Sequence, residues 1–539
     1  MSEFDALEHA VLEHLFTLTP RVAVDAGLHQ YDGKLPDLSR PATDRWADQA
    51  DTLLRRLRDL AVDTLTADRR YDRVLLEMAL ESARFDLLDS RDYDQNPMVC
   101  AGALSLTPYT VRAYAPLPVR IDAMRRHLAA VPAFLQGSLS RLAAEVPAPF
   151  IRLAMATARG IEANYRDVEP LVRSFSDASM ERIREVRGPA LAAVRAFADR
   201  LEKEWLPRAT QAFALGPDRY QKLLWVRERV SAPFSDLLAA GRADLERNQV
   251  RLRVIAAAAD PPTDGPGLIA RAAQTHPTSA QLIPRARDFV DEMKMFVREK
   301  ELVTIPEPAV CRVEETPPYY RELATASLNP PGAFDTAGEE GMFFVTPVDP
   351  AWRPETQEAW LRSFNDSVLR NTAVHEVYPG HYLQFLHLRR SPASRTRKVL
   401  LSGAFVEGWA HYAEQLVLEQ GLGAGAPEAE AAQLQDALLR DCRLIVSIGL
   451  HTQGMTVAEA TTVFEREAYC EPIVAQREAG RGTYEPAYFA YTLGKFAILD
   501  VRRKHLSAQF GGSLRAFHDR LLGFGAPPVG FLDDLLKAT

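Results

Sequence analysis

The stretch VHEVYPGHYLQ, residues 374–384, combines residue types that bind and use metal ions. His375 and His381 carry imidazoles, which zinc accepts as ligands, and Glu376 is a carboxylate that can take a proton from water. A zinc-binding helix of the HExxH type spaces its histidines four residues apart. Here the two are six apart, and positions six apart on a regular helix diverge by about 240°. A regular helix therefore cannot direct both rings at one ion.

Pro379 and Gly380 can interrupt the helix between the two histidines. Pro379 has no N–H and cannot bond to the carbonyl of His375, four residues earlier. Gly380 adopts backbone angles that other residues resist. The sequence therefore predicts that the helix bulges or breaks at residues 377–380 and restarts, which returns His381 to the face of His375.

A third ligand is needed, because catalytic zinc usually has three protein ligands and one open position. The segment 403–421 places Glu407, His411 and Glu414 at i, i+4 and i+7, on one stripe of a predicted helix. Three polar side chains among aromatic and apolar neighbours either face solvent or face a charged group. Together with the histidine pair, this stripe favours the second interpretation.

The elements that must position these residues are helices. Phe4, Leu7, Val11, Leu15 and Leu18 recur at three- and four-residue steps, as on one face of a helix. We expect a mainly α fold with an N-terminal helical region (1–258), a proline-rich irregular connection (259–350) and a C-terminal helical region carrying the metal site (351–539). Two short strands are expected in the connection, near residues 309–313 and 342–346.

Composition excludes several other classes. A net charge of −8 argues against nucleic-acid binding, which needs a basic surface. The sequence contains no run of about 18 apolar residues that would indicate a membrane span. Four widely spaced cysteines indicate neither a disulfide framework nor a cysteine–zinc module. The chain begins with acidic residues, where a secretory signal would be basic, and its few cysteines suit a reducing compartment, so we expect a cytoplasmic protein.

Five segments together resemble the domain of unknown function 885 family of bacterial proteins. In chain order they are HEVYPGHYLQ, FVEGWAHYAEQLVLEQG, RLIVSIGLHTQGMT, GTYEPAYFAYTLGK and LRAFHDRLLGFGAPP. That family resembles helical zincins such as thimet oligopeptidase and neurolysin, in which a glutamate follows the histidine motif by about 25 residues. The resemblance implies that His375, His381 and Glu407 hold zinc and that Glu376 activates its water.

The resemblance also suggests roles for residues around the ion. His411 and Glu414 are expected to orient the ligands by hydrogen bonds, although one of them could instead replace a ligand. Oligopeptidases donate a His or Tyr from a C-terminal segment to the developing oxyanion. By similarity, His451 and Tyr491 are the candidates here, and Tyr484 and Tyr488 are further tyrosines of the same segment.

The function predicted from the sequence is zinc-dependent hydrolysis of an amide bond, in a short peptide or small amide substrate. Two alternatives stay open at this point. One is a zinc hydrolase or lyase that acts on a non-peptide amide or ester. The other is a non-catalytic helical binding protein with a degenerate site. The metal is an inference as well, since a site with two histidines and a glutamate also accepts cobalt or manganese.

Overall fold

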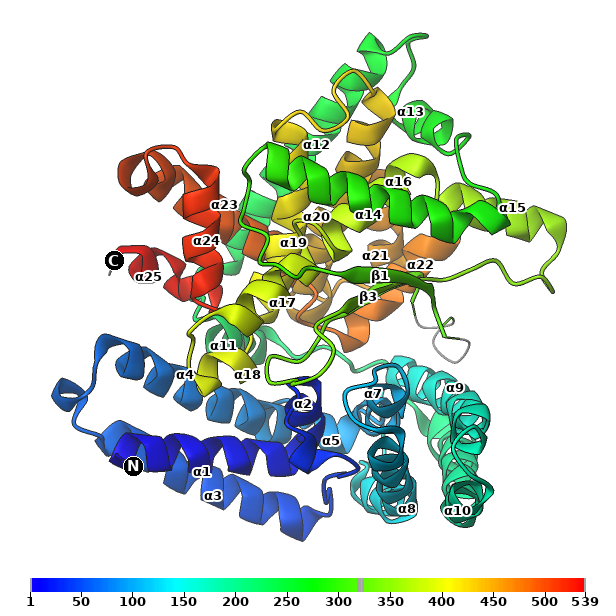
Figure 1. The fold of residues 1–539 in the computed structure, drawn as a ribbon, viewed down its shortest axis with the longest axis vertical. Coiled ribbons are helices and arrows are strands. Elements are labelled where there is room, and N and C mark those ends of the chain that lie inside the picture. Colours follow the sequence, from blue (N-terminus) through cyan, green and yellow to red (C-terminus); the bar gives the residue numbers. More distant parts are fainter. Residues whose placement is uncertain (1, 318–320, 322–323, 538–539) are drawn as a thin grey trace.

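The computed structural model describes residues 2–317, 321 and 324–537, and it confirms the mainly α fold expected from the sequence (Figure 1). The first ten helices are α1 (Glu3–Leu18), α2 (Pro20–Asp25), α3 (Arg40–Asp59), α4 (Ala67–Arg84), α5 (Asp92–Gln95), α6 (Met98–Ala103), α7 (Thr107–Thr110), α8 (Leu117–Arg141), α9 (Ala148–Arg173) and α10 (Asp177–Arg200).

The later elements include a small sheet. They are α11 (Pro217–Glu228), α12 (Phe234–Ala258), α13 (Gly265–Ala272), α14 (Leu282–Glu299), β1 (Cys311–Glu315), β2 (Ala326–Asn329), β3 (Gly341–Val345), α15 (Pro354–Ser363), α16 (Asp366–Glu376), α17 (His381–Arg390), α18 (Arg395–Val399), α19 (Gly403–Glu419), α20 (Pro427–Thr452), α21 (Val457–Glu467), α22 (Pro472–Tyr484), α23 (Ala490–Phe510), α24 (Leu514–Gly523) and α25 (Leu532–Lys537).

The apolar periodicity seen in the sequence corresponds to real buried faces. In α1 all five of the periodic residues from Phe4 to Leu18 are buried, and Ser2 caps the helix by accepting a hydrogen bond from the Asp5 N–H. No described helix is both long enough and apolar enough to cross a membrane.

The buried apolar side chains of the described residues form three clusters. One is built almost entirely from residues 4–205, and the other two, apart from Phe85, combine residues after 210 with the C-terminal helices. The boundary between the first cluster and the other two falls near residue 210, and α12 packs along α20. Figure 1 shows the first ten helices as a blue and cyan layer beneath the body formed by the later elements.

The stretch expected to be irregular holds more structure than the sequence indicated. It includes α14, an 18-residue helix, and a three-stranded sheet of order β1-β3-β2. The two expected strands coincide with β1 and β3, which pair in parallel with Cys311 opposite Gly341. The unpredicted strand β2 runs antiparallel to β3. Its four residues, ASLN, are all half-buried and lack the alternating pattern that identifies a strand.

Helices α19 and α23 cross with their backbones in contact, and this crossing positions two of the predicted site residues. A Cβ added at Gly408 would lie 2.4 Å from the Gly494 backbone, and one added at Gly494 would lie 1.7 Å from the Ala404 carbonyl oxygen. Only glycine fits at either position. The crossing brings Glu407, next to Gly408, close to the start of α23, where Tyr491 lies.

We predict that Gly494→Ala destabilises the protein, because the added methyl group must push α19 and α23 apart. A forced overpacking of this kind costs about 1–3 kcal/mol or more. Thermal unfolding followed by circular dichroism should show a lowered Tm. Gly480→Ala is the matched control, because Gly480 lies within α22 with no atom within 4 Å of the added Cβ. There, alanine should leave Tm unchanged or raise it. Equal effects of the two variants would contradict the steric explanation.

His29 ties the loop before β3 to the N-terminal layer. Its Nε2 lies 2.8 Å from Asp335 Oδ1, its Nδ1 lies 3.2 Å from Asp32 Oδ1, and its ring stacks on Tyr114 at 3.8 Å between centroids. Burial alone would lower the pKa of His29, but the two carboxylates raise it to about 9. The imidazolium form therefore holds two segments that are about 300 residues apart in sequence.

The contribution of His29 to stability should depend on pH. A histidine with a folded-state pKa raised from 6.5 to about 9 stabilises the fold fully below pH 6.5, and it loses that contribution as pH rises through 9. We expect His29→Gln to lower Tm by about 2 °C at pH 6 and to match the wild type near pH 9.5. His9→Gln, on the exposed face of α1, is the control. A Tm difference for His29→Gln that does not change with pH would refute the ion-pair explanation.

Candidate metal centre

The predicted distortion at residues 377–380 is a complete break between two helices. Helix α16 ends at Glu376 and α17 begins at His381. Gly380 lies so close to the end of α16 that its N–H bonds to the Val374 carbonyl at 3.0 Å, and an added Cβ would lie 1.8 Å from the His375 carbonyl oxygen. Trp409 of α19 fixes the turn from the other side, because its Nε1–H donates to the Pro379 carbonyl at 2.8 Å.

This break brings the two histidines together. His375 lies in the last turn of α16 and His381 is the first residue of α17, so their ring centroids are 4.7 Å apart at an interplanar angle of 84°. Glu407 reaches the same point from α19. Its Oε2 lies 3.7 Å from His375 Nε2 and 3.5 Å from His381 Nε2, and one ligand atom of each residue falls within 4.8 Å of the others. The three residues predicted as ligands therefore converge.

The two spacings between Glu407 and the histidine nitrogens are compatible with a tetrahedral ion. Two ligands each about 2.0 Å from a tetrahedral zinc are roughly 3.3 Å apart, close to the spacing between Glu407 Oε2 and both nitrogens. Both histidines are buried, and Glu407 Oε2 has no hydrogen-bond partner among the described residues. A buried carboxylate oxygen that faces two ring nitrogens and bonds to neither is an arrangement that a shared cation would complete.

Glu414 supports His375 from behind. Its Oε1 accepts a hydrogen bond from His375 Nδ1 at 2.6 Å and lies 3.0 Å from the Arg440 guanidinium. Asn371 donates to its other oxygen at 3.3 Å. Burial would raise the pKa of Glu414, but Arg440 and the bond from His375 hold it well below its usual value. A charged Glu414 keeps a proton on His375 Nδ1 and leaves Nε2 directed toward Glu407.

His411 lies outside the cluster, although it is on the same stripe of α19. It is fully buried, neither of its ring nitrogens has a hydrogen-bond partner among the described residues, and its Nδ1 is 3.6 Å from Glu414. Burial and the nearby ammonium of Lys495 lower the pKa of His411 to about 3, so the ring is neutral. Of the two residues expected to orient the ligands, Glu414 touches a ligand and His411 does not.

Tyr491 lies at the centre. Its ring stacks on His375 with centroids 6.5 Å apart, and the guanidinium groups of Arg440 and Arg443 lie 5.6 Å and 4.9 Å from its centroid. Arg440, Arg443 and Asn371 were not identified from the sequence. The sequence indicated only that these residues lie on helices. It contains no pattern that would place α20 against α16 and α19.

The other candidates for oxyanion donors have different surroundings from Tyr491. His451 comes 11 residues after Arg440 on α20, about 16 Å further along the helix. Its Nε2 lies 2.8 Å from the Gly482 carbonyl and its Nδ1 accepts from the Leu215 N–H, so no ring nitrogen remains to donate. Tyr488 belongs to a hydrophobic cluster, and Tyr484 ends α22 against the N-terminal core. These three residues are not assigned to the centre.

Glu376 is the acid available beside the histidines. It is partly exposed, and it makes no hydrogen bond or ion pair with any residue that the structure describes. Its charge acts on Cys311 at the start of β1, where burial and the Glu376 carboxylate help raise the pKa of the thiol to about 12. Glu376 is therefore free to interact with water or a substrate.

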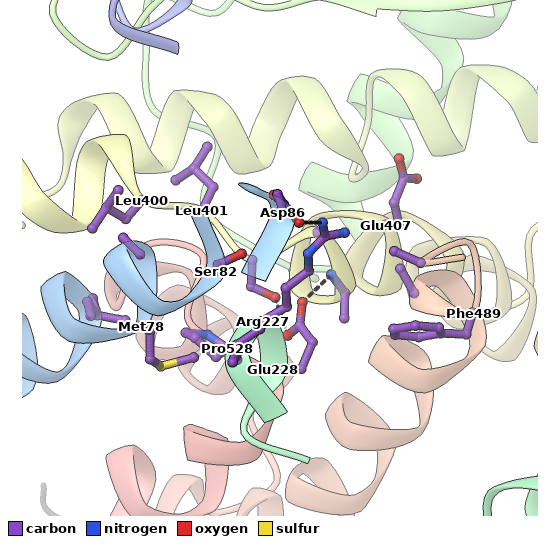
Figure 2. A pocket seen from close by; sticks show the side chains of 18 of the residues that line it. Met78, Ser82, Asp86, Arg227, Glu228, Leu400, Leu401, Glu407, Phe489 and Pro528 are labelled. Carbon is purple, nitrogen blue, oxygen red and sulfur yellow. Dashed lines mark hydrogen bonds and ion pairs between the residues drawn. The ribbon is translucent and has the colours of Figure 1, made fainter. Parts of the chain in front are cut away.

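A cavity of about 490 Å³ adjoins the centre, with Glu407 and Tyr491 in its lining. It lies between α4 of the N-terminal layer and the segments around α19 and α23. Figure 2 shows Met78 and Leu400 on one side, Glu407 and Phe489 on the other, and the ion pair of Arg227 with Asp86 between them in this view. The cavity gives the centre access to a space large enough for a small substrate.

Comparison with known proteins identifies the family. Residues 20–536 match the family described as "Bacterial protein of unknown function (DUF885)", and because the match spans nearly the whole chain, the protein belongs to this family. The expected membership of the domain of unknown function 885 family is thus confirmed, whereas the expected likeness to zincins stays a prediction. Among curated proteins none matches significantly.

Two solved structures share the fold. One is a "putative lipoprotein of unknown function" from Shewanella oneidensis, with a TM-score of 0.81 and 24% identity over 100% of both chains. The other is a "putative lipoprotein" from Colwellia psychrerythraea, with a TM-score of 0.81 and 15% identity over 99% of this chain and 98% of that one. At these identities the likeness shows the fold alone.

The expected cytoplasmic location is wrong by this comparison. Both similar structures are described as lipoproteins, a class attached to membranes by lipid and found outside the cytoplasm. The expectation rested partly on the low number of cysteines, and few cysteines are compatible with any compartment.

If the centre binds a metal ion, Glu407→Ala should reduce the metal content of purified protein after zinc incubation from near one equivalent to a small fraction, because one of three ligands is lost. Inductively coupled plasma analysis measures this. Glu485→Ala is the matched control, since Glu485 lines the same cavity but pairs with Arg481. Unchanged zinc in Glu407→Ala would remove Glu407 from the ligand set.

Proposed function

We propose that the protein is a zinc-dependent hydrolase that cleaves amide bonds in short peptides. The observation that supports this proposal is the convergence of His375, His381 and Glu407, with one ligand atom of each within 4.8 Å of the others. Two imidazoles and one carboxylate are a donor set used by catalytic zinc sites, which keep one position open. When bound, zinc supplies Lewis acidity toward a carbonyl oxygen and lowers the pKa of water.

Glu376 is proposed as the general base. Its carboxylate follows His375 in sequence, is accessible, and has no internal partner among the described residues. It can therefore accept a proton from the attacking water and return that proton to the departing amine nitrogen.

Tyr491 is proposed as the hydrogen-bond donor to the developing oxyanion. Burial and the nearby Glu407 charge raise its pKa, so the hydroxyl keeps its proton. Arg440 and Arg443 flank the ring and limit its movement, which favours donation from a fixed position. Glu414 serves the reaction indirectly, because its bond to Nδ1 fixes the orientation of His375.

The proposal predicts that Glu376→Gln keeps about one equivalent of zinc and loses hydrolysis of short peptides by roughly 10²–10⁴-fold, because the amide cannot accept a proton. Zinc analysis and mass-spectrometric detection of peptide products test the two halves separately. Glu355→Gln, on the exposed first turn of α15, should behave as the wild type. Retained hydrolysis in Glu376→Gln would exclude Glu376 as the base. No turnover by the zinc-loaded wild type on peptides, amides or esters would reject the hydrolase proposal.

A further inference from the structure

The cavity beside the centre carries apolar side chains that the fold leaves uncovered. Val22 of α2 is 42% exposed and Leu401, just before α19, is 38% exposed, although both are large hydrophobic residues that normally lose water on folding. Both line this cavity, one from the N-terminal layer and one from the C-terminal body. Leu75, Met78 and Phe489 extend the same apolar lining.

The charged groups of the lining are already paired, apart from the proposed ligand Glu407. Asp86 accepts from the Arg227 guanidinium at 2.8 Å, and Glu485 pairs with Arg481. Glu228 is buried and accepts from the Ser402 hydroxyl and from the N–H groups of Ala404 and Val529, at 2.6–3.2 Å. A charged side chain entering the cavity would lose its hydration and find no free partner there.

The size of the cavity limits what it can hold. The volume of about 490 Å³ falls within the range of about 300–1,000 Å³ that is typical of small-ligand pockets in proteins. Because Glu407 and Tyr491 are part of the lining, a group bound here lies next to the proposed reaction site.

We infer that this cavity binds an uncharged, bulky apolar part of the substrate, so that the substrates are short peptides with large aliphatic or aromatic residues beside the scissile bond. The inference rests on the proposed function, because only a hydrolase has a substrate with a bond to be cleaved. The binding preference itself follows from the apolar lining and the paired charges. Val22 on the N-terminal side of the cavity and Leu401 on the C-terminal side are the residues that favour apolar over charged substrates.

Binding can be measured without turnover. The zinc-loaded Glu376→Gln variant is titrated by calorimetry with three capped tripeptide amides that are identical except for a central Leu, Asp or Lys. We expect the Leu peptide to bind at least tenfold more tightly than the other two. Leu401→Lys should weaken binding of the Leu peptide by about tenfold or more, because an ammonium replaces apolar surface. The ratio of the dissociation constants of the Asp and Leu peptides should therefore decrease.

Matched variants separate this effect from general damage. Val254→Lys introduces the same charge at a 53% exposed valine of α12, outside the cavity lining, and should leave all three affinities unchanged. Val22→Lys repeats the test from the opposite wall if Leu401→Lys does not fold, and zinc content with thermal unfolding checks each variant.

The outcomes distinguish the two proposals. Equal binding of the three peptides, no binding of any, or equal effects of Leu401→Lys and Val254→Lys would overturn the cavity inference. Preferential binding of the Leu peptide that depends on Leu401, in a protein that hydrolyses nothing in its wild-type form, would uphold the cavity inference and reject the hydrolase proposal.

Discussion

The close approach of Gly380 to the end of α16 is the constraint on which the rest of the centre depends. The backbone there is so near the His375 carbonyl that no side chain fits, and the Gly380 N–H bonds back to Val374. This contact allows the chain to stop one helix and begin another within four residues. Two imidazoles that a continuous helix would send in different directions therefore face one point, and Trp409 of α19 holds the turn in place by its bond to Pro379.

A second contact of the same kind sets the third ligand. Helix α19 carries Glu407 next to Gly408, and Gly408 and Gly494 let α19 and α23 meet backbone to backbone. The positions of Glu407 and Tyr491 are thus fixed by rigid helices rather than by loops, which limits how far the side chains can drift from a working geometry. Backbone contact sets the arrangement in both places, and side-chain packing follows from it.

Buried charge is concentrated around His375. Glu414, Arg440, Asn371 and Asp436 lie together behind its ring, and burying such groups is costly unless each has a partner. Hydrophobic residues of similar size would stabilise the fold at lower cost, so this network is better explained by what it does to the imidazole than by stability. It holds a proton on His375 Nδ1 and leaves Nε2 directed at Glu407. On the far side of Glu407, the lining changes to apolar side chains and paired charges, so the site joins a polar centre to an apolar cavity.

The helical class, the interruption at Pro379 and Gly380, and the residue types of the candidate metal site could all be predicted from the amino-acid sequence. These predictions follow from local rules: apolar periodicity, the missing N–H of proline, and the spacing of Glu407 from His411 and Glu414 on one helix. The sequence did not reveal β2, whose four residues lack alternation, or α14 within a stretch rich in prolines. It also placed His451 among the donors, although its ring is engaged by backbone groups on both sides. The folded structure was needed to show that Arg440, Arg443 and Asn371 lie around the centre and that α4 and α19 line one cavity. Those relations depend on which helix faces fit together, and side chains far apart in the chain carry no local pattern that records it.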